Sequence, residues 1–251
     1  MNFETYSKYY DLLYQDKDYA KEAAYLIEQY SAIKGETPKS ILDLGCGTGI
    51  HAFEMSKLTN GKVHGIDRSV DMIDKARNKY SDESLLNFTE SDILDFQSDE
   101  RFDFVISVFH ILSYQTSNDA FNQYFKVAAD HLNKDGVFVF DCWYGPCVLN
   151  IRPETRFKVF ESDQIKLKRA ALPDLKFQEN LVDVNYDISI LEKSSGHFTE
   201  FSELHPMRYY FMPEIKMMLK KHNLKLLNAK EWMSDQNLSE ITWSACFVVS
   251  K

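Results

Sequence analysis

The order of apolar and polar residues over the first 142 positions predicts alternating strands and helices. Short apolar runs alternate with segments in which apolar side chains recur every three or four positions, as on one face of a helix. The predicted strands are residues 40–44, 62–67, 85–89, 102–108 and 136–140. The predicted helices are residues 18–30, 50–58, 70–80 and 118–132. This alternation is typical of crossover connections, so we expect a parallel sheet covered by helices on both faces.

Beyond Pro146 the pattern changes to an alternation of polar and apolar residues, which is typical of antiparallel strands. Four such segments cover residues 156–161, 165–172, 177–191 and 197–211. Ser194, Ser195 and Gly196 predict a hairpin turn between the last two. A helix from Pro213 to about His222 and strands over 224–232 and 242–250 would then complete the main sheet.

These elements predict a Rossmann-like α/β fold with a seven-stranded, mostly parallel sheet, helices on both faces and an antiparallel β insertion. We expect residues 1–145 and 213–251 to form the α/β core and residues 146–212 to form the insertion.

Composition and charge narrow the range of partners. The chain has 14% aromatic residues with only 9 Gly and 6 Pro, which excludes low-complexity disorder. Its 29 Lys and Arg against 38 Asp and Glu leave a net charge of -9, which argues against broad binding to nucleic acid or to an anionic membrane. The N-terminal stretch lacks the pattern of a signal peptide, and no long apolar run occurs, so we expect a cytoplasmic protein.

The cysteines give no sign of a metal site or a disulfide framework. Cys46, Cys142, Cys147 and Cys246 form no CxxC pair and have no His at metal-ligand spacing. Glu203 and His205 would share one face of a strand, but no third ligand is identifiable, so we expect no metal.

The segment Asp43-Leu44-Gly45-Cys46-Gly47-Thr48-Gly49 is the most informative in the chain. Three glycines at alternate positions between a buried strand and a helix allow a ligand to lie directly against the main chain. The dinucleotide fingerprint needs a glycine where Ile50 stands, and no Lys follows the glycines as in a P-loop. A nucleoside ligand is therefore favoured over a pyrophosphate or a nucleoside triphosphate.

Two acidic residues follow the second and third strands. Asp67 comes 22 residues after Gly45, where a carboxylate can accept the hydroxyl protons of a ribose, although it can also cap the next helix. Asp92 and Ile93 would offer a hydrogen-bond acceptor and an apolar face to an adenine, although a turn or cap role explains Asp92 as well.

With this glycine motif and the spacing to Asp67, the sequence resembles the class I S-adenosylmethionine-dependent methyltransferases. The resemblance covers Ile41 to about Cys142 and Pro213 to Lys251. It implies S-adenosyl-L-methionine as cofactor, with its methionine part on the glycines, its ribose on Asp67 and its adenine on Asp92 and Ile93. The cofactor-binding residues so predicted are Asp43, Gly45, Cys46, Gly47, Gly49, Asp67, Arg68, Asp92, Ile93 and Val108.

Within that class, Tyr10-Asp11-Leu12-Leu13-Tyr14 with Asp18-Tyr19, together with the insertion, is similar to amino-sugar N-methyltransferases acting on nucleotide-linked sugars. Glycine N-methyltransferase is a more distant relative in outline. Sugar N-methyltransferases are expected to have a His near the position of Tyr114, and this chain departs from them there.

Methyl transfer from a sulfonium needs alignment and exclusion of water more than side-chain chemistry. Ligands of parallel sheets lie beyond the carboxyl ends of the strands, so His110 after the fourth strand is a candidate proton acceptor, or a structural His beside the cofactor. Tyr14 is the second candidate catalytic residue, from an aromatic segment that either closes as a lid or packs on the core. The predicted substrate-binding residues are Tyr10, Tyr14, Tyr114, Trp143, His205 and Arg208.

We therefore expect methyl transfer to a small-molecule acceptor, favouring an amino group of a nucleotide-linked sugar, with the insertion covering the acceptor site. O-methylation, or N-methylation of a simpler amine, is the alternative enzymatic activity. A non-catalytic S-adenosylmethionine-binding regulator is the alternative from another class, because no unmistakable catalytic base is present. An NAD-dependent dehydrogenase and a nucleic-acid methyltransferase are disfavoured by the motifs, and a homodimer is left open.

Overall fold

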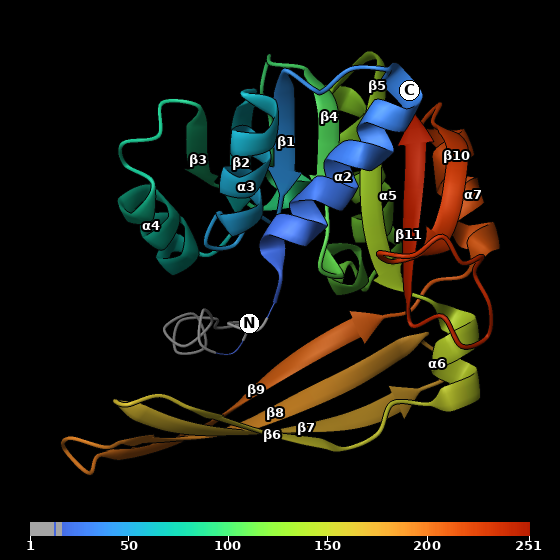
Figure 1. Ribbon diagram of the computed structural model, residues 1–251. Coiled ribbons are helices and arrows are strands. Elements are labelled where there is room, and N and C mark those ends of the chain that lie inside the picture. The colour runs from blue at the N-terminus through green and yellow to red at the C-terminus, as the bar shows by residue number, and fades with distance from the viewer. Residues whose placement is uncertain (1–12, 14–16) are drawn as a thin grey trace.

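A computed structural model of the chain describes Leu13 and residues 17–251, and its centre is a seven-stranded sheet (Figure 1). The strand order is β10-β11-β5-β4-β1-β2-β3, and β11 is the one strand of this sheet that runs against its neighbours. The strands are β1 (Ser40–Leu44), β2 (Lys62–Asp67), β3 (Leu86–Glu90), β4 (Phe102–Ser107), β5 (Leu132–Trp143), β10 (Lys225–Glu231) and β11 (Ser244–Ser250). The predicted mostly parallel α/β sheet is confirmed.

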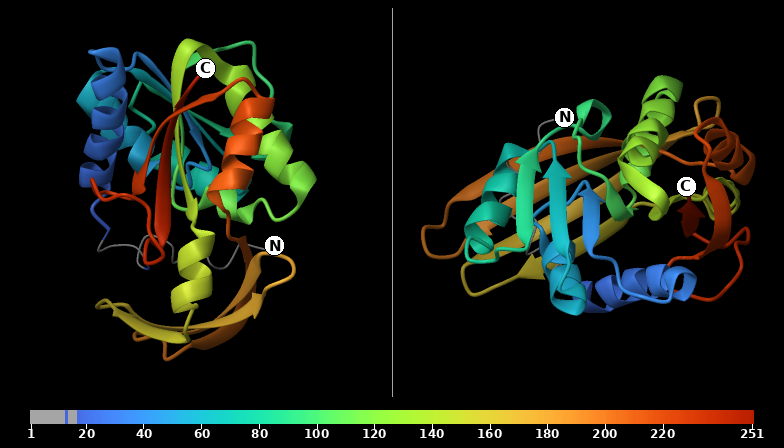
Figure 2. Two further views of the ribbon diagram at one scale, coloured as in Figure 1. Left: turned by 90° about the vertical axis from the view of Figure 1, so that its right-hand side faces the viewer. Right: turned by 90° about the horizontal axis from the view of Figure 1, so that it is seen from above.

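Helices cover both faces of this sheet (Figure 2). On one face lie α2 (Tyr19–Lys34), α3 (Ile50–Thr59) and α4 (Val70–Lys79), and on the other lie α5 (Asn118–His131) and α7 (Met212–Lys221). Two short 3-10 helices, η1 (Ile93–Asp95) and η2 (Ile111–Tyr114), follow β3 and β4. Among the described residues, no helix is long and apolar enough to span a membrane.

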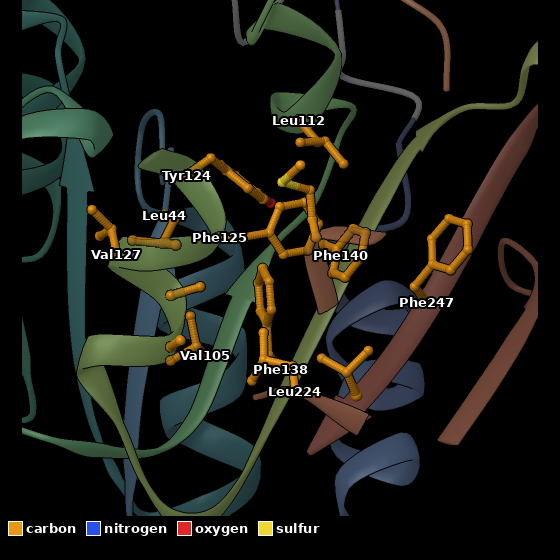
Figure 3. Close-up of a cluster of buried hydrophobic side chains, with 14 of the residues drawn as sticks. Leu44, Val105, Leu112, Tyr124, Phe125, Val127, Phe138, Phe140, Leu224 and Phe247 are labelled. Atoms are coloured by element: carbon orange, nitrogen blue, oxygen red, sulfur yellow. The ribbon is translucent and has the colours of Figure 1, made fainter. Parts of the chain in front are cut away.

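The packing of the core explains why the central strands of the main sheet have continuously apolar sequences. In β5, Val137 and Val139 pack with the α2 and α3 side, while Phe138 and Phe140 pack with α5 and α7. Figure 3 shows Phe138 and Phe140 beside Phe125 and near Phe247. Because helices bury both faces of the sheet, neither set of alternate positions can be polar.

The insertion is a four-stranded antiparallel sheet in the order β6-β7-β8-β9. Its strands are β6 (Arg156–Glu161), β7 (Ile165–Lys176), β8 (Leu181–Glu192) and β9 (Phe198–Arg208). The predicted turn with Gly196, which has φ +70°, joins β8 to β9. This sheet lies below the end of the main sheet at which the parallel strands finish (Figure 1), so both sheets can contribute to one site there.

The structure differs from the expected elements at three places. No helix was expected over the residues of α6 (Gly145–Ile151). Pro146 does not interrupt this helix, because it lies in the first turn, a position that proline favours. Strand β7 continues through Pro173, which still aligns with Val184 of β8. Strand β5 begins at Leu132 instead of Gly136, and its register against β4 shifts around Asp135, where φ is +64°.

Candidate active site

A cavity of about 370 Å³ opens where β1, β2 and β4 end, between the core and the insertion. Its position at the carboxyl ends of parallel strands, and its size, are typical of ligand sites in such sheets. Of the predicted site residues, the cavity is lined by Asp43, Gly45, Cys46, Gly47, Asp67, Arg68, Asp92, Ile93, Val108, His110, Tyr114, Trp143 and His205.

The glycine loop after β1 depends on backbone angles that favour glycine. Gly45 has φ +86°, and a Cβ there would lie 2.7 Å from Cδ1 of Ile111. Gly47 has φ +55°, and a Cβ there would meet nothing within 4 Å. Gly49 does not line the cavity, because it is the N-cap of α3 and its α-carbon packs closely against Phe88. Gly45 and Gly47 therefore line the cavity, with open space at Gly47, and Gly49 allows α3 to pack closely against Phe88.

Asp67 holds this loop in place while facing the cavity. Its Oδ2 accepts a hydrogen bond from the Gly47 N–H at 2.9 Å, and its Oδ1 accepts one from the Ser69 N–H at 2.9 Å. Burial raises the pKa of Asp67, and these two hydrogen bonds oppose the rise. A carboxylate offers about four lone-pair sites, so Asp67 retains acceptor capacity for a ligand.

Asp43 lies at the end of β1 and is 2% exposed. Burial raises the pKa of Asp43 to about 7, with a further upward contribution from Asp67 and a downward one from Lys17. Its Oδ2 has no hydrogen-bond partner among the described residues, although it is fully buried. A buried carboxylate oxygen of this kind is suited to a cationic ligand group.

At the far end of the cavity, Asp92 accepts a hydrogen bond from the Leu94 N–H at 2.9 Å. Asp92 therefore caps η1 and also lines the cavity, which combines the two roles considered for it. Ile93 and Met72 add apolar surface beside it.

The segment after β4 is strained, since Phe109 and His110 both have positive φ, +67° and +64°. The His110 backbone N–H donates to Oδ1 of Asp141 at 2.8 Å, and Nδ1 of the His110 ring lies 2.8 Å from Oδ2. Burial alone would raise the pKa of Asp141, but the charge and hydrogen bonding of His110 and the Ser244 hydroxyl lower it. Asp141 itself does not line the cavity, so it acts on the site through His110.

The insertion reaches the cavity through β8 and β9. Nδ1 of His205 lies 3.0 Å from the Tyr114 hydroxyl, and its Nε2 lies 3.4 Å from Oε2 of Glu203. Burial lowers the pKa of His205 to about 4, and the charges of Arg169 and Arg68 add to this effect. The imidazole is thus neutral near pH 7, and its Nδ1 can accept the proton of the Tyr114 hydroxyl.

Arg208 does not line the cavity, and two further predicted residues lie outside the described part of the chain. Arg208 turns away from the cavity, because its guanidinium donates to Asn118 and Glu214 at 2.9 Å each. Tyr10 and Tyr14 lie outside the described residues, so their proposed roles in the lid stay predictions.

Sequence reasoning missed a polar group at the start of α2. Lys17 and Tyr19 line the cavity, and Glu22 links Lys17 to His51 in the first turn of α3. Their place in the chain could have indicated them, because a helix that leads into β1 begins at the same edge of the sheet as the glycine loop. Within the part of the chain that the structure describes, no cluster of three metal-ligating side chains occurs.

Residues 41–136, from β1 to the start of β5, match the family model of a methyltransferase domain. Residues 41–136 are a methyltransferase domain. A curated relative, dTDP-3-amino-3,4,6-trideoxy-alpha-D-glucopyranose N,N-dimethyltransferase of Streptomyces venezuelae, is 33% identical over 141 residues. That match covers 55% of this chain and 56% of the relative, so the chain is aligned to little more than half of that enzyme.

Solved structures resemble the chain over almost its whole length. An S-adenosylmethionine-dependent methyltransferase from Clostridium acetobutylicum matches with a TM-score of 0.80 and 23% identity, over 97% of this chain and 96% of that one. An amino pentose methyltransferase from Micromonospora echinaspora, solved with S-adenosylmethionine bound, matches with a TM-score of 0.77 and 17% identity, over 100% and 98%. The fold, insertion included, is that of class I S-adenosylmethionine-dependent methyltransferases.

Proposed function

We propose that this chain transfers a methyl group from S-adenosylmethionine to a small-molecule acceptor, and that the acceptor is an amino group of a nucleotide-linked sugar. One observation carries the first part: the glycine loop and the carboxylate of Asp67 face the same cavity at the end of the parallel strands. Main chain without side chains beside a carboxylate suits a nucleoside whose diol binds Asp67.

The cavity also fits the amino-acid part of that cofactor. Gly47 leaves open space where any other residue would have a side chain, and the buried Oδ2 of Asp43 lacks a partner among the described residues. The ammonium of the methionine part can supply that partner. Asp92, Ile93 and Met72 would hold the adenine.

When bound, the cofactor supplies a methyl group on a positively charged sulfur, which is a strong electrophile. The residues of this chain then have to bind both reactants, orient the acceptor nitrogen and exclude water. The insertion serves the last purpose, since Tyr186, His205 and Met207 from β8 and β9 form a wall of the cavity.

His110 is suited to receive the proton that the acceptor nitrogen loses. Asp141 lies beside its Nδ1, which leaves Nε2 as the nitrogen available to an acceptor proton. Tyr114 is suited to orient the acceptor, because it lines the cavity and its hydroxyl is held 3.0 Å from Nδ1 of the neutral His205.

Two findings support an amino-sugar acceptor. The curated relative at 33% identity acts, by its name, on a dTDP-linked amino sugar, and the amino pentose methyltransferase shares the fold over the whole chain. In addition, Tyr186 and His205 of the insertion bring an aromatic and a polar side chain to the cavity wall.

The test is transfer of labelled methyl from S-adenosylmethionine to a panel of amino-sugar nucleotides, simple amines and hydroxyl acceptors. We expect label on an amino-sugar nucleotide, and loss of the signal in Asp67→Asn but not in Asp74→Asn, an exposed carboxylate on α4. Labelling of hydroxyl acceptors alone would reject the amine, and cofactor binding without transfer to any acceptor would favour a regulatory protein.

A further inference from the structure

Residues 112–118 lead from η2 into α5, and they form part of the cavity wall. Tyr114, Gln115 and Thr116 line the cavity. The helix η2 is a short 3-10 turn, in which the Gln115 N–H donates to the Leu112 carbonyl. Turns of this kind have poor hydrogen-bond geometry and little stability of their own. Groups from other elements therefore have to fix the position of the Tyr114 hydroxyl.

Tyr210 supports this segment from within the core. It follows the end of β9 by two residues and is fully buried. Its hydroxyl donates to the Gln115 carbonyl at 2.5 Å and lies 3.4 Å from the Leu112 carbonyl oxygen. Burial raises the pKa of Tyr210 well above its usual value, so the hydroxyl remains a donor. The ring stacks on Phe121 of α5 with 4.5 Å between the ring centres, which fixes the direction of this hydroxyl.

Arg208 holds the other end of the segment. Its Nη1 donates to Oδ1 of Asn118 at 2.9 Å and lies 3.4 Å from the Thr116 carbonyl oxygen. Its Nη2 donates to Oε1 of Glu214 in α7 at 2.9 Å. The guanidinium carbon lies 4.9 Å from the centre of the Tyr210 ring. Because a guanidinium donates in several fixed directions, one side chain can bind the start of α5 and the start of α7 together.

His205 contacts the same segment from the cavity side, with its Nδ1 3.0 Å from the Tyr114 hydroxyl. Arg208 and Tyr210 do not line the cavity, so they reach the segment from outside it. Three residues at the end of β9 and just beyond it thus bind successive parts of residues 112–118. The position of the Tyr114 hydroxyl therefore depends on how the insertion returns to the core.

We propose that Arg208 and Tyr210 are positioning residues, which hold residues 112–118 so that the Tyr114 hydroxyl lies where the acceptor binds. The inference rests on the proposed function, in which Tyr114 orients the acceptor. The competing explanation is that the two side chains only join the end of β9 to α5 and α7.

Tyr210→Phe removes the hydroxyl alone, and Tyr209→Phe is its matched control. Tyr209 is also fully buried, but its hydroxyl has no hydrogen-bond partner among the described residues. With the acceptor found in the labelling assay, Tyr210→Phe should raise the acceptor KM by ~5–10-fold, as for one lost hydrogen bond, and leave the affinity for S-adenosylhomocysteine within about twofold. Tyr209→Phe should leave both quantities unchanged. Arg208→Lys is the second variant, because it keeps the charge but loses the fork, and it should also raise the acceptor KM.

A double variant shows whether the effect passes through Tyr114. In a Tyr114→Phe background, which already lacks the orienting hydroxyl, Tyr210→Phe should raise the acceptor KM by no more than about twofold. Equal effects on KM in the two backgrounds, or no effect of Tyr210→Phe on KM, would overturn the inference and leave a structural role.

Fluorine NMR with 3-fluorotyrosine at position 114 tests the placement of this side chain without any acceptor. Tyr210→Phe should shift the resonance, whereas Tyr209→Phe should not, and an unchanged resonance in Tyr210→Phe would likewise overturn the inference. If the wild-type protein transfers a methyl group to no acceptor, the proposed function has failed. The resonance still reports the placement of Tyr114 in that case, so the two failures are distinguishable.

Discussion

At the residue scale, the cavity combines carboxylates in different states of ionisation. Asp141 is held in its charged form by His110 and Ser244, whereas Oδ2 of Asp43 has no hydrogen-bond partner among the described residues, and Asp43 takes up a proton near neutral pH. Both side chains are almost completely buried, so the difference follows from their neighbours: the charge and hydrogen bonds of His110 and the Ser244 hydroxyl lower the pKa of Asp141, whereas the charge of Asp67 raises that of Asp43.

Asp43 makes cofactor affinity dependent on pH. Only the ionised carboxyl attracts an ammonium, so affinity for S-adenosylhomocysteine should rise as the pH increases through about 7, the pKa of Asp43 in the free protein. Between pH 6 and pH 8 the gain should approach ~10-fold by calorimetry. Asp43→Asn should bind more weakly at pH 8 and lose this dependence; a variant that keeps the wild-type slope would show that another group titrates.

His110 and Asp141 predict a loss of turnover without a loss of cofactor binding. His110→Asn should lower kcat by about 10²-fold or more, the usual contribution of a general base. Asn is chosen because it tolerates the positive φ at this position. Affinity for S-adenosylhomocysteine should stay within about twofold, and His222→Asn, at the end of α7, is the control. Unchanged kcat in His110→Asn would make His110 a structural residue.

At the element scale, the connection from β1 to α3 is shaped by glycine. Gly45 and Gly47 adopt positive φ where the chain turns from the buried strand to the cavity wall, and Asp67 from β2 fastens this turn through the Gly47 N–H. Two neighbouring strands and one turn thus build the surface on which the cofactor is expected to lie.

Gly47→Ala separates the cost of backbone strain from the cost of filling the cavity. Gly35→Ala is the matched control, because Gly35 also has positive φ and open space around its α-carbon but lies at the end of α2. Each substitution should lower the free energy of unfolding by about 1–2 kcal/mol, the cost of a side chain in the left-handed region. Only Gly47→Ala should also weaken S-adenosylhomocysteine binding, and equal affinities of the two variants would contradict a cofactor on this loop.

At the scale of the whole molecule, the site is divided between two sheets. The core supplies the glycine loop and the strand-end carboxylates, while the insertion supplies His205, Tyr186 and Met207. Tyr114 of η2 and His205 of β9 connect the two parts at 3.0 Å. We therefore expect cofactor binding to depend on the core and acceptor selection to depend on the insertion.

His205→Ala tests this division with the acceptor found in the labelling assay. Loss of the partner of the Tyr114 hydroxyl should raise the acceptor KM by about tenfold, as for one lost hydrogen bond. The affinity for S-adenosylhomocysteine should not change. His197→Ala, in an exposed position at the far end of the same sheet, should leave both quantities unchanged; weaker cofactor binding in His205→Ala would refute the division.

Much of the fold follows from local patterns in the chain. The apolar run from Val137 to Phe140 predicts a strand that is buried on both faces of the sheet, and the structure confirms this prediction. Pro146 and Pro173 misled the interpretation, because proline is tolerated in the first turn of a helix and in some strand positions, and the distinction depends on neighbours that the local sequence does not specify.

The sequence by itself determined the alternation of strands and helices, the glycine turn after β1, and the presence of Asp67 at the end of β2. These features depend on the period of apolar residues and on the backbone freedom of glycine, which act over a few positions. Only the tertiary structure decided which polar groups meet: Glu22 with His51 across 29 positions, His110 with Asp141 across 31, and Tyr114 with His205 across 91. Such pairs arise from the packing of whole elements, and that packing is set by the burial of a shared core, which no short segment contains.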